Sequence, residues 1–279
     1  MKNKVAVITG SSSGFGCLTS IALAKAGYHV FATMRTLERS GQLADTARKE
    51  GVSERITCIQ LDVTEFSRIP AVIEQIVKQA GQIDLLVNNA GYAAGGFVEE
   101  LPLPEWQRQF ATNVFGVIAV TQAVLPHMRA RRQGRIINVG SISGRIGFPG
   151  LAPYAASKHA LEGFSESLRL EMKPFQIEVV LIEPGAYRTA IWDKGFRQLA
   201  AVPDSPYATL LGRLLAEVKQ ITGAAQDPSE VVQAIVKAAT VGQPRFRYPV
   251  GKGIRMLLLA KALLPWNWLE KLIAKRLNH

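Results

Sequence analysis

A tyrosine and a lysine four residues apart, Tyr154 and Lys158 in the segment YAASK, could together carry out proton transfer. Residues at this spacing share one face of a helix, so the lysine ammonium can lie near the phenol. A free phenol, with a pKa of about 10, is a poor proton donor or acceptor at neutral pH. A neighbouring cation stabilises the phenolate and moves the phenol toward use as a general acid or base.

Ser141 follows the apolar run RIINV and precedes Tyr154 by thirteen residues. Just past the end of a strand, its hydroxyl can hydrogen-bond a substrate oxygen while hydride arrives at or leaves the neighbouring carbon. A single YxxxK more often holds a packed aromatic ring and a solvated surface charge. Partner motifs elsewhere in the chain must therefore decide between the catalytic and the structural interpretation.

Three glycines, Gly10, Gly14 and Gly16, separate the apolar run VAVIT from a helical pattern. Gly10 can close the turn, Gly14 can let a phosphate approach the backbone, and Gly16 can let the helix pack close to the strand. An ATP-binding P-loop would need Lys-Ser/Thr after its last glycine, and Cys17 stands there instead. The turn predicts a dinucleotide pyrophosphate at a helix N-terminus, the alternative being only a tight connection.

Short β-branched runs alternate with helical periodicity along the chain. The expected strands are 5–9, 29–34, 56–63, 83–91, 135–141 and 177–185, and the expected helices are 18–27, about 38–50, 69–81, about 104–130 and about 152–173. Strands that are apolar throughout indicate a parallel sheet covered on both faces. We expect an α/β protein, a single-domain doubly wound parallel sheet of the Rossmann type, in which ligands bind beyond the carboxyl ends of the strands. This domain should span 1–250, with a substrate lid at about 187–225 and a basic amphipathic helical extension at 251–279.

Further motifs make the chain resemble the short-chain dehydrogenase/reductase family from residue 4 to about 190. They are NNAG ending at Gly91, NVFG containing Asn113, and Pro184–Gly185, which join TGSSSGFG, Ser141 and YAASK. Each motif is weak alone, whereas the joint match is specific. The resemblance implies that Lys158 also holds the nicotinamide ribose and that Asn113 anchors a water in a proton relay.

The candidate residues form two sets. The catalytic set is Asn113, Ser141, Tyr154 and Lys158. The cofactor-binding set is Gly10, Ser13, Gly14, Phe15, Gly16, Arg35, Asp62, Val63, Asn89, Ala90, Gly91, Tyr154, Lys158, Pro184 and Gly185. By resemblance, Asp62 and Val63 form the adenine pocket and Asn89 to Gly91 line the adenosine ribose; otherwise Asp62 is a strand-end cap and Asn-Ala-Gly is plain turn chemistry.

The expected second strand ends without the carboxylate that an NAD site usually places there for the ribose 2′-hydroxyl. Its last residues are Ala32-Thr33-Met34-Arg35. Arg35 has a guanidinium suited to a 2′-phosphate, and Ser13 can add a hydroxyl contact. NADP(H) is therefore favoured over NAD(H), and the alternative is that Arg35 is an ordinary solvated charge.

The substrate is predicted to be bulky and apolar. Tyr187, Trp192, Phe148 and Pro149 can offer apolar walls, or can simply pack the lid. The segment VFATMR and the long C-terminal extension resemble the branch that contains 17β-hydroxysteroid and retinol dehydrogenases, which implies a secondary alcohol or carbonyl on a steroid-, retinoid- or lipid-like molecule. Alternatives are a 3-oxoacyl thioester reductase and a catalytically silent NADP(H)-binding regulator or scaffold.

The net charge of +11 is concentrated at one end of the chain. Residues 245–279 carry a net +7, which leaves +4 for the preceding 244 residues. A protein that grips nucleic acid along its body would spread cations and stacking aromatics over that surface, so no nucleic-acid partner is expected.

The basic tail could contact a membrane without crossing it. Met256 to Leu264 is shorter than the roughly 20 residues of a span, and Pro265 would end its helix. Beyond it, apolar residues recur at helical spacing: Trp268, Leu269, Leu272, Ile273 and Leu277. This stripe fits either an interfacial helix on an anionic membrane or a cover for the pocket or a partner subunit.

Other features predict location and assembly. The run MKNKVAVITG leaves no room for a signal-peptide core, and Cys17 and Cys58 read as free thiols, so we expect a cytoplasmic protein, with membrane association if the tail binds lipid. The four histidines form no cluster, so no metal is expected. The resemblance implies a homodimer or homotetramer that pairs the helices near 104–130 and 152–173.

Overall fold

The computed structural model describes residues 4–187, 205–223 and 227–277. Seven strands form one parallel sheet in the order β3-β2-β1-β4-β5-β6-β7. The strands are β1 Lys4–Ile8, β2 Tyr28–Met34, β3 Ile56–Gln60, β4 Leu85–Asn88, β5 Gly134–Val139, β6 Ile177–Pro184 and β7 Arg247–Val250. This is the predicted doubly wound α/β fold, in which the order reverses beside β1 and opens a crevice at the carboxyl edge.

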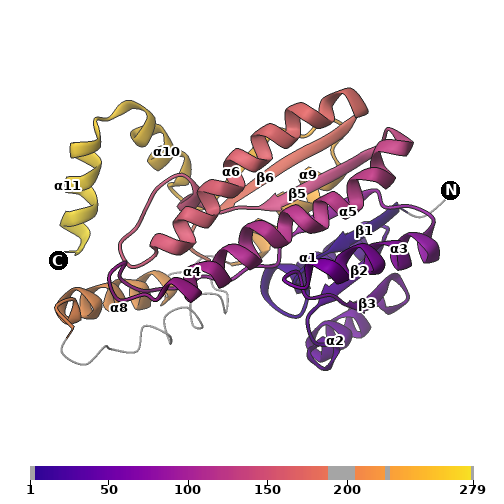
Figure 1. The fold of residues 1–279 in the computed structure, drawn as a ribbon, viewed down its shortest axis with the longest axis horizontal. Helices are drawn as coiled ribbons and strands as arrows, with labels where there is room; N and C mark the ends of the chain where they lie inside the picture. The colour runs from indigo at the N-terminus through magenta and orange to yellow at the C-terminus, as the bar shows by residue number, and fades with distance from the viewer. Residues whose placement is uncertain (1–3, 188–204, 224–226, 278–279) are drawn as a thin grey trace.

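Helices cover both faces of the sheet (Figure 1). One layer contains α1 Gly14–Lys25, α2 Gly41–Lys49 and α9 Ser229–Thr240, and the other contains α3 Ile69–Ala80, α5 Gly116–Arg131 and α6 Ala152–Met172. The apolar strands serve both layers because successive side chains point to opposite faces. In β1, Ala6 and Ile8 join the first core and Val5 and Val7 the second.

The helix expected near 104–130 is interrupted. The chain forms α4 Leu103–Phe110, a π-helical turn Ala111–Phe115, and then α5. At Gly116 a Cβ atom would lie 2.8 Å from the Val63 carbonyl oxygen, so only glycine lets the helix start this close to the loop after β3. Such π-helical turns are frequent at functional sites, and this one buries Asn113.

Two strands are shorter than the sequence predicts. β3 ends at Gln60 rather than 63, and β4 ends at Asn88 rather than 91. Beyond these points the backbone leaves the sheet ladder, because the chain must turn over the carboxyl edge. The residues that overrun the strands, among them Asp62 and Asn89, thereby become available to the crevice.

The C-terminal part adds α8 Ala208–Gly223, α10 Ile254–Leu263 and α11 Trp266–Leu277. Most of the lid expected at 187–225, including Trp192, lies outside the described residues, and α8 is its main described element. α10 ends before Pro265, as predicted, and α10 and α11 lie to one side of the sheet, where buried Leu269 marks the packing of α11 near α8 (Figure 1). The boundary at residue 250 stays a prediction.

One helical stretch among the described residues, Leu103–Arg131, is long and apolar enough to cross a membrane by length and composition. Its apolar side chains have another role in this fold. Val120 and Val124 are fully buried against the sheet and α3, as in the core helix of a globular protein.

Candidate active site

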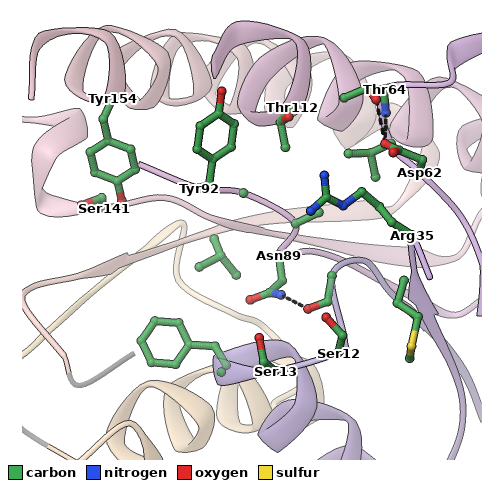
Figure 2. Close-up of a pocket in the computed structure, with 18 of the residues that line it drawn as sticks. Ser12, Ser13, Arg35, Asp62, Thr64, Asn89, Tyr92, Thr112, Ser141 and Tyr154 are labelled. Carbon is green, nitrogen blue, oxygen red and sulfur yellow. Dashed lines mark hydrogen bonds between the residues drawn. The ribbon is translucent and has the colours of Figure 1, made fainter. Parts of the chain in front are cut away.

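The turn between β1 and α1 is held by the loop that follows β4. The Thr9 hydroxyl oxygen accepts hydrogen bonds from the backbone amides of Asn89 and Ala90, both at 3.0 Å. The Asn89 side-chain amide donates to the carbonyls of Thr9 and Gly10 at 2.9 and 3.1 Å (Figure 2). A Cβ atom on Gly10 would lie 2.7 Å from the Ala90 Cα, and one on Gly16 only 2.3 Å from the Gly10 carbonyl oxygen. Gly10 and Gly16 therefore permit the close packing that the sequence predicts.

Gly14 has a different role in the same turn. Its φ of +57° lies in the left-handed region, and no atom lies within 4 Å of the position that a Cβ would occupy. Gly14 thus exposes backbone to the crevice at the first residue of α1, and Ser13 before it makes no side-chain cap hydrogen bond. A helix N-terminus with such an open approach fits a dinucleotide pyrophosphate.

A cavity of about 600 Å³ runs along the carboxyl edge of the sheet. Arg35 and Asp62 lie at one side of it, and Ser141 and Tyr154 at the opposite side (Figure 2). The predicted residues that line it are Gly10, Ser13, Gly14, Phe15, Arg35, Asp62, Val63, Asn89, Ala90, Gly91, Ser141, Tyr154, Lys158, Pro184 and Gly185. Gly16 and Asn113 support the wall from behind and are not part of it.

Ser141, Tyr154 and Lys158 are brought together at one end of the cavity, all buried. The Ser141 hydroxyl oxygen accepts a hydrogen bond from the Ser143 amide at 3.1 Å, and the Ser141 and Tyr154 side chains are hydrogen-bonded to each other. The Lys158 ammonium donates to the Val139 carbonyl at 2.8 Å and lies 5.7 Å from the centre of the Tyr154 ring. An acid or base, a hydroxyl donor and a cation therefore face one reaction space.

Burial sets the protonation of these groups. It raises the pKa of the Tyr154 phenol, and the hydrogen bond with Ser141 opposes this only in part. The sequence predicts a phenol pKa lowered by the lysine, whereas in this pocket burial has the largest effect on that pKa and the Lys158 ammonium donates to the Val139 carbonyl. Burial also lowers the pKa of Lys158 to about 8, and the negative charge of Glu162 opposes that shift.

The Asn113 side chain connects its own turn to two other segments. Its side-chain amide donates to the Tyr92 carbonyl at 3.0 Å and to the Ser157 hydroxyl at 3.2 Å, and its side-chain oxygen accepts from the Tyr92 amide at 3.1 Å. These bonds join the π-helical turn, the loop after β4 and α6. The expected role of Asn113 in anchoring a water stays a prediction.

The opposite end of the cavity is cationic. Arg35 follows β2, and Arg39, on the next turn, also lines the cavity. The Asp62 carboxylate faces inward, but its Oδ1 accepts hydrogen bonds from the Thr64 amide and hydroxyl at 2.9 and 2.7 Å. Since β2 itself ends without a carboxylate, this end suits a phosphate group better than a free ribose hydroxyl.

Sequence reasoning missed Arg39, Tyr92 and Arg108, which line the cavity as well. Arg39 follows Arg35 by four residues, and Tyr92 follows NNAG directly. Their positions beside predicted site residues could therefore have identified both. Arg108 hydrogen-bonds the Tyr92 side chain from α4, a contact that no local pattern could indicate.

Two of the residues expected to form apolar walls do not line the cavity. Tyr187 lines the cavity, where its ring meets Phe15 edge to face, whereas Phe148 and Pro149 do not line it. Within residues 4–187, 205–223 and 227–277, no group of three or more His, Cys, Asp or Glu side chains could hold a metal ion.

The chain is similar to curated proteins over nearly its whole length. It is 46% identical to an uncharacterized oxidoreductase, YusZ, of Bacillus subtilis, with 99% of each chain covered. It is 35% identical to a 3-ketodihydrosphingosine reductase of Bacteroides thetaiotaomicron, covering 97% of this chain and 96% of that one. Retinol dehydrogenase 8 of Bos taurus is 36% identical, covering 94% and 86%.

Solved structures share the fold. A short-chain dehydrogenase from Streptomyces avermitilis has a TM-score of 0.81 at 32% identity, covering 99% of this chain and 96% of that one. ElxO with NADP bound has a TM-score of 0.77 at 25% identity, covering 91% and 99%. A dehydrogenase from Burkholderia phymatum in complex with NAD has a TM-score of 0.81 at 25% identity, covering 94% and 93%.

The short chain dehydrogenase family model matches residues 4–200, which include the glycine turn, the cationic end and the Ser141, Tyr154 and Lys158 cluster. The cavity built by those residues fits a nicotinamide dinucleotide, and relatives carry the name of retinol dehydrogenase. The chain therefore belongs to the short-chain dehydrogenase/reductase family, in the branch that includes retinol and 17β-hydroxysteroid dehydrogenases, and it is an oxidoreductase.

Proposed function

We propose that this protein interconverts a secondary alcohol and a carbonyl on a bulky apolar substrate, with NADP(H) as the hydride carrier. One observation carries the proposal: a single cavity joins a buried Ser141, Tyr154 and Lys158 to a glycine turn and to the guanidinium side chain of Arg35.

The residues have distinct roles in this reaction. When bound, the nicotinamide supplies hydride to the carbonyl carbon, or accepts it from the alcohol. During reduction Tyr154 donates its phenolic proton to the substrate oxygen, and during oxidation it takes that proton back. Ser141 hydrogen-bonds the same oxygen, while Lys158 holds the nicotinamide ribose and stabilises the phenolate. Asn113 holds the π-helical turn beneath them in place, and we assign to it the binding of a water molecule in the proton relay.

The cofactor-binding residues follow the length of the cavity. The backbone of Gly14 and Phe15 would face the pyrophosphate, Asp62 and Val63 the adenine, and Asn89 to Gly91 the adenosine ribose, while the Ser13 hydroxyl would join Arg35 at the 2′-phosphate. Pro184 and Gly185 close the nicotinamide end. Arg35, with Arg39 beside it, supports NADP(H) over NAD(H) through a charge-assisted contact with the 2′-phosphate.

An apolar, lipid-like substrate agrees with the names of two relatives, a 3-ketodihydrosphingosine reductase and a retinol dehydrogenase. A 3-oxoacyl thioester reductase and a silent cofactor-binding regulator are the alternatives. We would follow NADPH oxidation with long-chain 3-keto lipids, steroid ketones, retinal and acyl thioesters. Turnover of a long-chain 3-keto lipid or a steroid ketone supports the proposal. Turnover of retinal alone, which gives a primary alcohol, contradicts its secondary-alcohol part, and turnover of acyl thioesters alone supports the thioester reductase. Cofactor binding without turnover of any compound supports the regulator.

We also propose a homodimer or homotetramer. Four valines of the helical stretch near 104–130 are buried within one chain, namely Val114, Val117, Val120 and Val124. Large apolar residues remain exposed nearby, namely Leu103, Phe115 and Leu170. Their burial against a second copy would remove an apolar surface from water, and light scattering measures the resulting mass.

The tail supports a peripheral membrane contact of an otherwise cytoplasmic protein. Five large apolar residues on α10 and α11 are exposed, namely Met256, Leu259, Leu263, Trp266 and Trp268. The exposed basic residues Lys252, Arg255 and Lys271 lie in the same segment. This combination matches an interfacial helix on an anionic lipid surface.

The Tyr154→Phe variant should bind NADPH nearly as the native protein does and lose turnover by about 100-fold or more, because the ring still packs but cannot exchange a proton. Lys158→Ala should impair both binding and turnover. Cofactor fluorescence and steady-state rates measure these effects. Near-normal turnover in Tyr154→Phe would show the acid–base assignment to be wrong.

The Arg35→Asp variant should weaken NADPH binding by at least about tenfold while changing NADH binding little, because a carboxylate would face the 2′-phosphate. The control is Arg48→Asp, which removes an exposed arginine paired with Asp45 on α2 and lies outside the cavity. Isothermal titration with both cofactors measures the ratio. Equal losses for NADPH and NADH would contradict the phosphate assignment.

The full chain should sediment with vesicles containing phosphatidylserine at low salt and not with pure phosphatidylcholine. Replacing Trp266 and Trp268 by Ser should weaken sedimentation by about tenfold or more, since burying one large apolar side chain contributes about 1.5–3 kcal/mol. Phe66→Ser, which replaces an exposed aromatic residue just before α3, outside the tail and the proposed subunit contact, is the control. If the native protein ignores anionic vesicles, the tail is a structural cover.

A further inference from the structure

Two glutamates are buried together behind the catalytic lysine. Glu162 lies one helical turn after Lys158 on α6, and Glu183 lies near the carboxyl end of β6. One oxygen of each carboxylate meets an arginine: Glu162 Oε2 accepts from Arg247 at 3.1 Å, and Glu183 Oε1 accepts from Arg145 at 3.1 Å. The other oxygens, Glu162 Oε1 and Glu183 Oε2, are buried and accept no hydrogen bond from the described residues.

A proton held between the two carboxyls would satisfy both of these oxygens. Two buried carboxylates in contact repel each other, and one proton between them relieves that repulsion. Burial, and then the charge of Glu183, raise the pKa of Glu162 to about 7, although Arg247 opposes this. The neighbouring Glu166 also contacts Arg247 but is largely exposed, with no such partner.

This acid pair adjoins the catalytic end of the cavity. A Cβ atom on Gly144 would lie 2.9 Å from the Lys158 carbonyl oxygen and 3.2 Å from the Glu162 Cγ, so the loop that begins at Ser141 rests on this turn of α6. Pro184, next to Glu183, lines the cavity.

Few charges reach Lys158 or the pair. Lys158 is faced by Tyr154 and Glu162 of α6, by the Val139 carbonyl of β5, and by Ser141, which lines the same end of the cavity. The charged groups around Glu162 are Glu166, Glu183, Arg145 and Arg247, with Lys261 of α10 bonded to the Arg145 carbonyl. Glu162 is the acid that acts on the lysine directly, because it lies four residues away on the same helix face.

We propose that Glu162 and Glu183 share one proton, and that Glu162 is a positioning residue whose negative charge, after that proton leaves, keeps the Lys158 ammonium charged. As the pH rises, the pair ionises before the lysine does, and the new charge holds the lysine proton to a higher pH. The shared proton depends only on the two glutamates. The effect on Lys158 rests on the proposed role of that lysine in holding the cofactor.

The shared proton is tested by thermal unfolding without cofactor. The folded-state pKa of Glu162 lies above its ordinary value of 4.5, so its protonated form contributes stability that is present below about pH 4.5 and lost as the pH rises through about 7. Glu162→Gln cannot ionise and escapes this loss, and its amide can donate to Glu183. The difference in Tm between Glu162→Gln and the native protein should therefore become more positive from pH 5.5 to pH 8, by about 2–4 °C.

Two variants sharpen this measurement. Glu166→Gln removes the exposed acid on the same arginine and should melt in parallel with the native protein at every pH. In a Glu183→Gln background the added Glu162→Gln should bring a smaller pH-dependent gain, because the repulsion by Glu183 is gone while burial still raises the pKa of Glu162. Parallel melting of Glu162→Gln and the native protein from pH 5.5 to pH 8 would overturn the shared proton.

The effect on Lys158 is tested by NADPH affinity between pH 6.5 and pH 8.5. Glu162→Gln should weaken binding progressively toward pH 8.5, by up to about tenfold for one unit of lysine pKa, while Glu166→Gln follows the native profile. In a Lys158→Gln background, Glu162→Gln should add no pH-dependent loss. An unchanged profile in Glu162→Gln would overturn the link to the lysine. If Lys158→Gln alone leaves NADPH affinity intact, the cofactor role of Lys158 fails, whereas the melting result on the acid pair stands.

Discussion

The buried ammonium of Lys158 is the constraint on which the geometry of the site depends. A charge inside a protein is costly unless it is paired and hydrogen-bonded. Here the Val139 carbonyl at the end of β5 accepts one hydrogen bond at 2.8 Å, and the charge of Glu162, when that residue is ionised, favours the protonated lysine. Satisfying this one group fastens α6 to the carboxyl edge of the sheet. Tyr154, one turn earlier on the same helix, is thereby set beside Ser141.

The polar interior beneath the site keeps that arrangement rigid. The Asn88 amide donates to Thr121 of α5 and to Asn138 of β5, and Asn138 donates to Ser165 of α6. These four side chains are all buried, so removing one of them would leave the polar group of its neighbour with neither a protein partner nor water to bond. Together with the clamp made by Asn113, these bonds fix two helices to two strands and leave the catalytic side chains little freedom.

Charged residues gather in three places: one end of the cavity, the region behind its catalytic end, and the C-terminal segment. The cavity is cationic at Arg35 and Arg39, where a phosphate would lie, while the acids behind it are paired with Arg145 and Arg247. Most of the net positive charge lies instead in residues 245–279. The positive potential of the protein thus has two sources, the arginines at one end of the cavity and the basic C-terminal segment.

Periodicity and local motifs determined six of the seven strands, the helices between them and most of the cavity wall, because glycine turns, strand ends and the YxxxK spacing act over a few residues. The sequence did not reveal the π-helical turn at Asn113, which ends where Gly116 lies against Val63 of the loop after β3. It also predicted a lowered Tyr154 pKa, whereas burial raises it, since desolvation depends on every element that closes over the ring. The pairing of Glu162 with Glu183 was decided by tertiary structure alone: the two residues belong to different elements, and only the packing of α6 against β6 brings their carboxyls into one buried site.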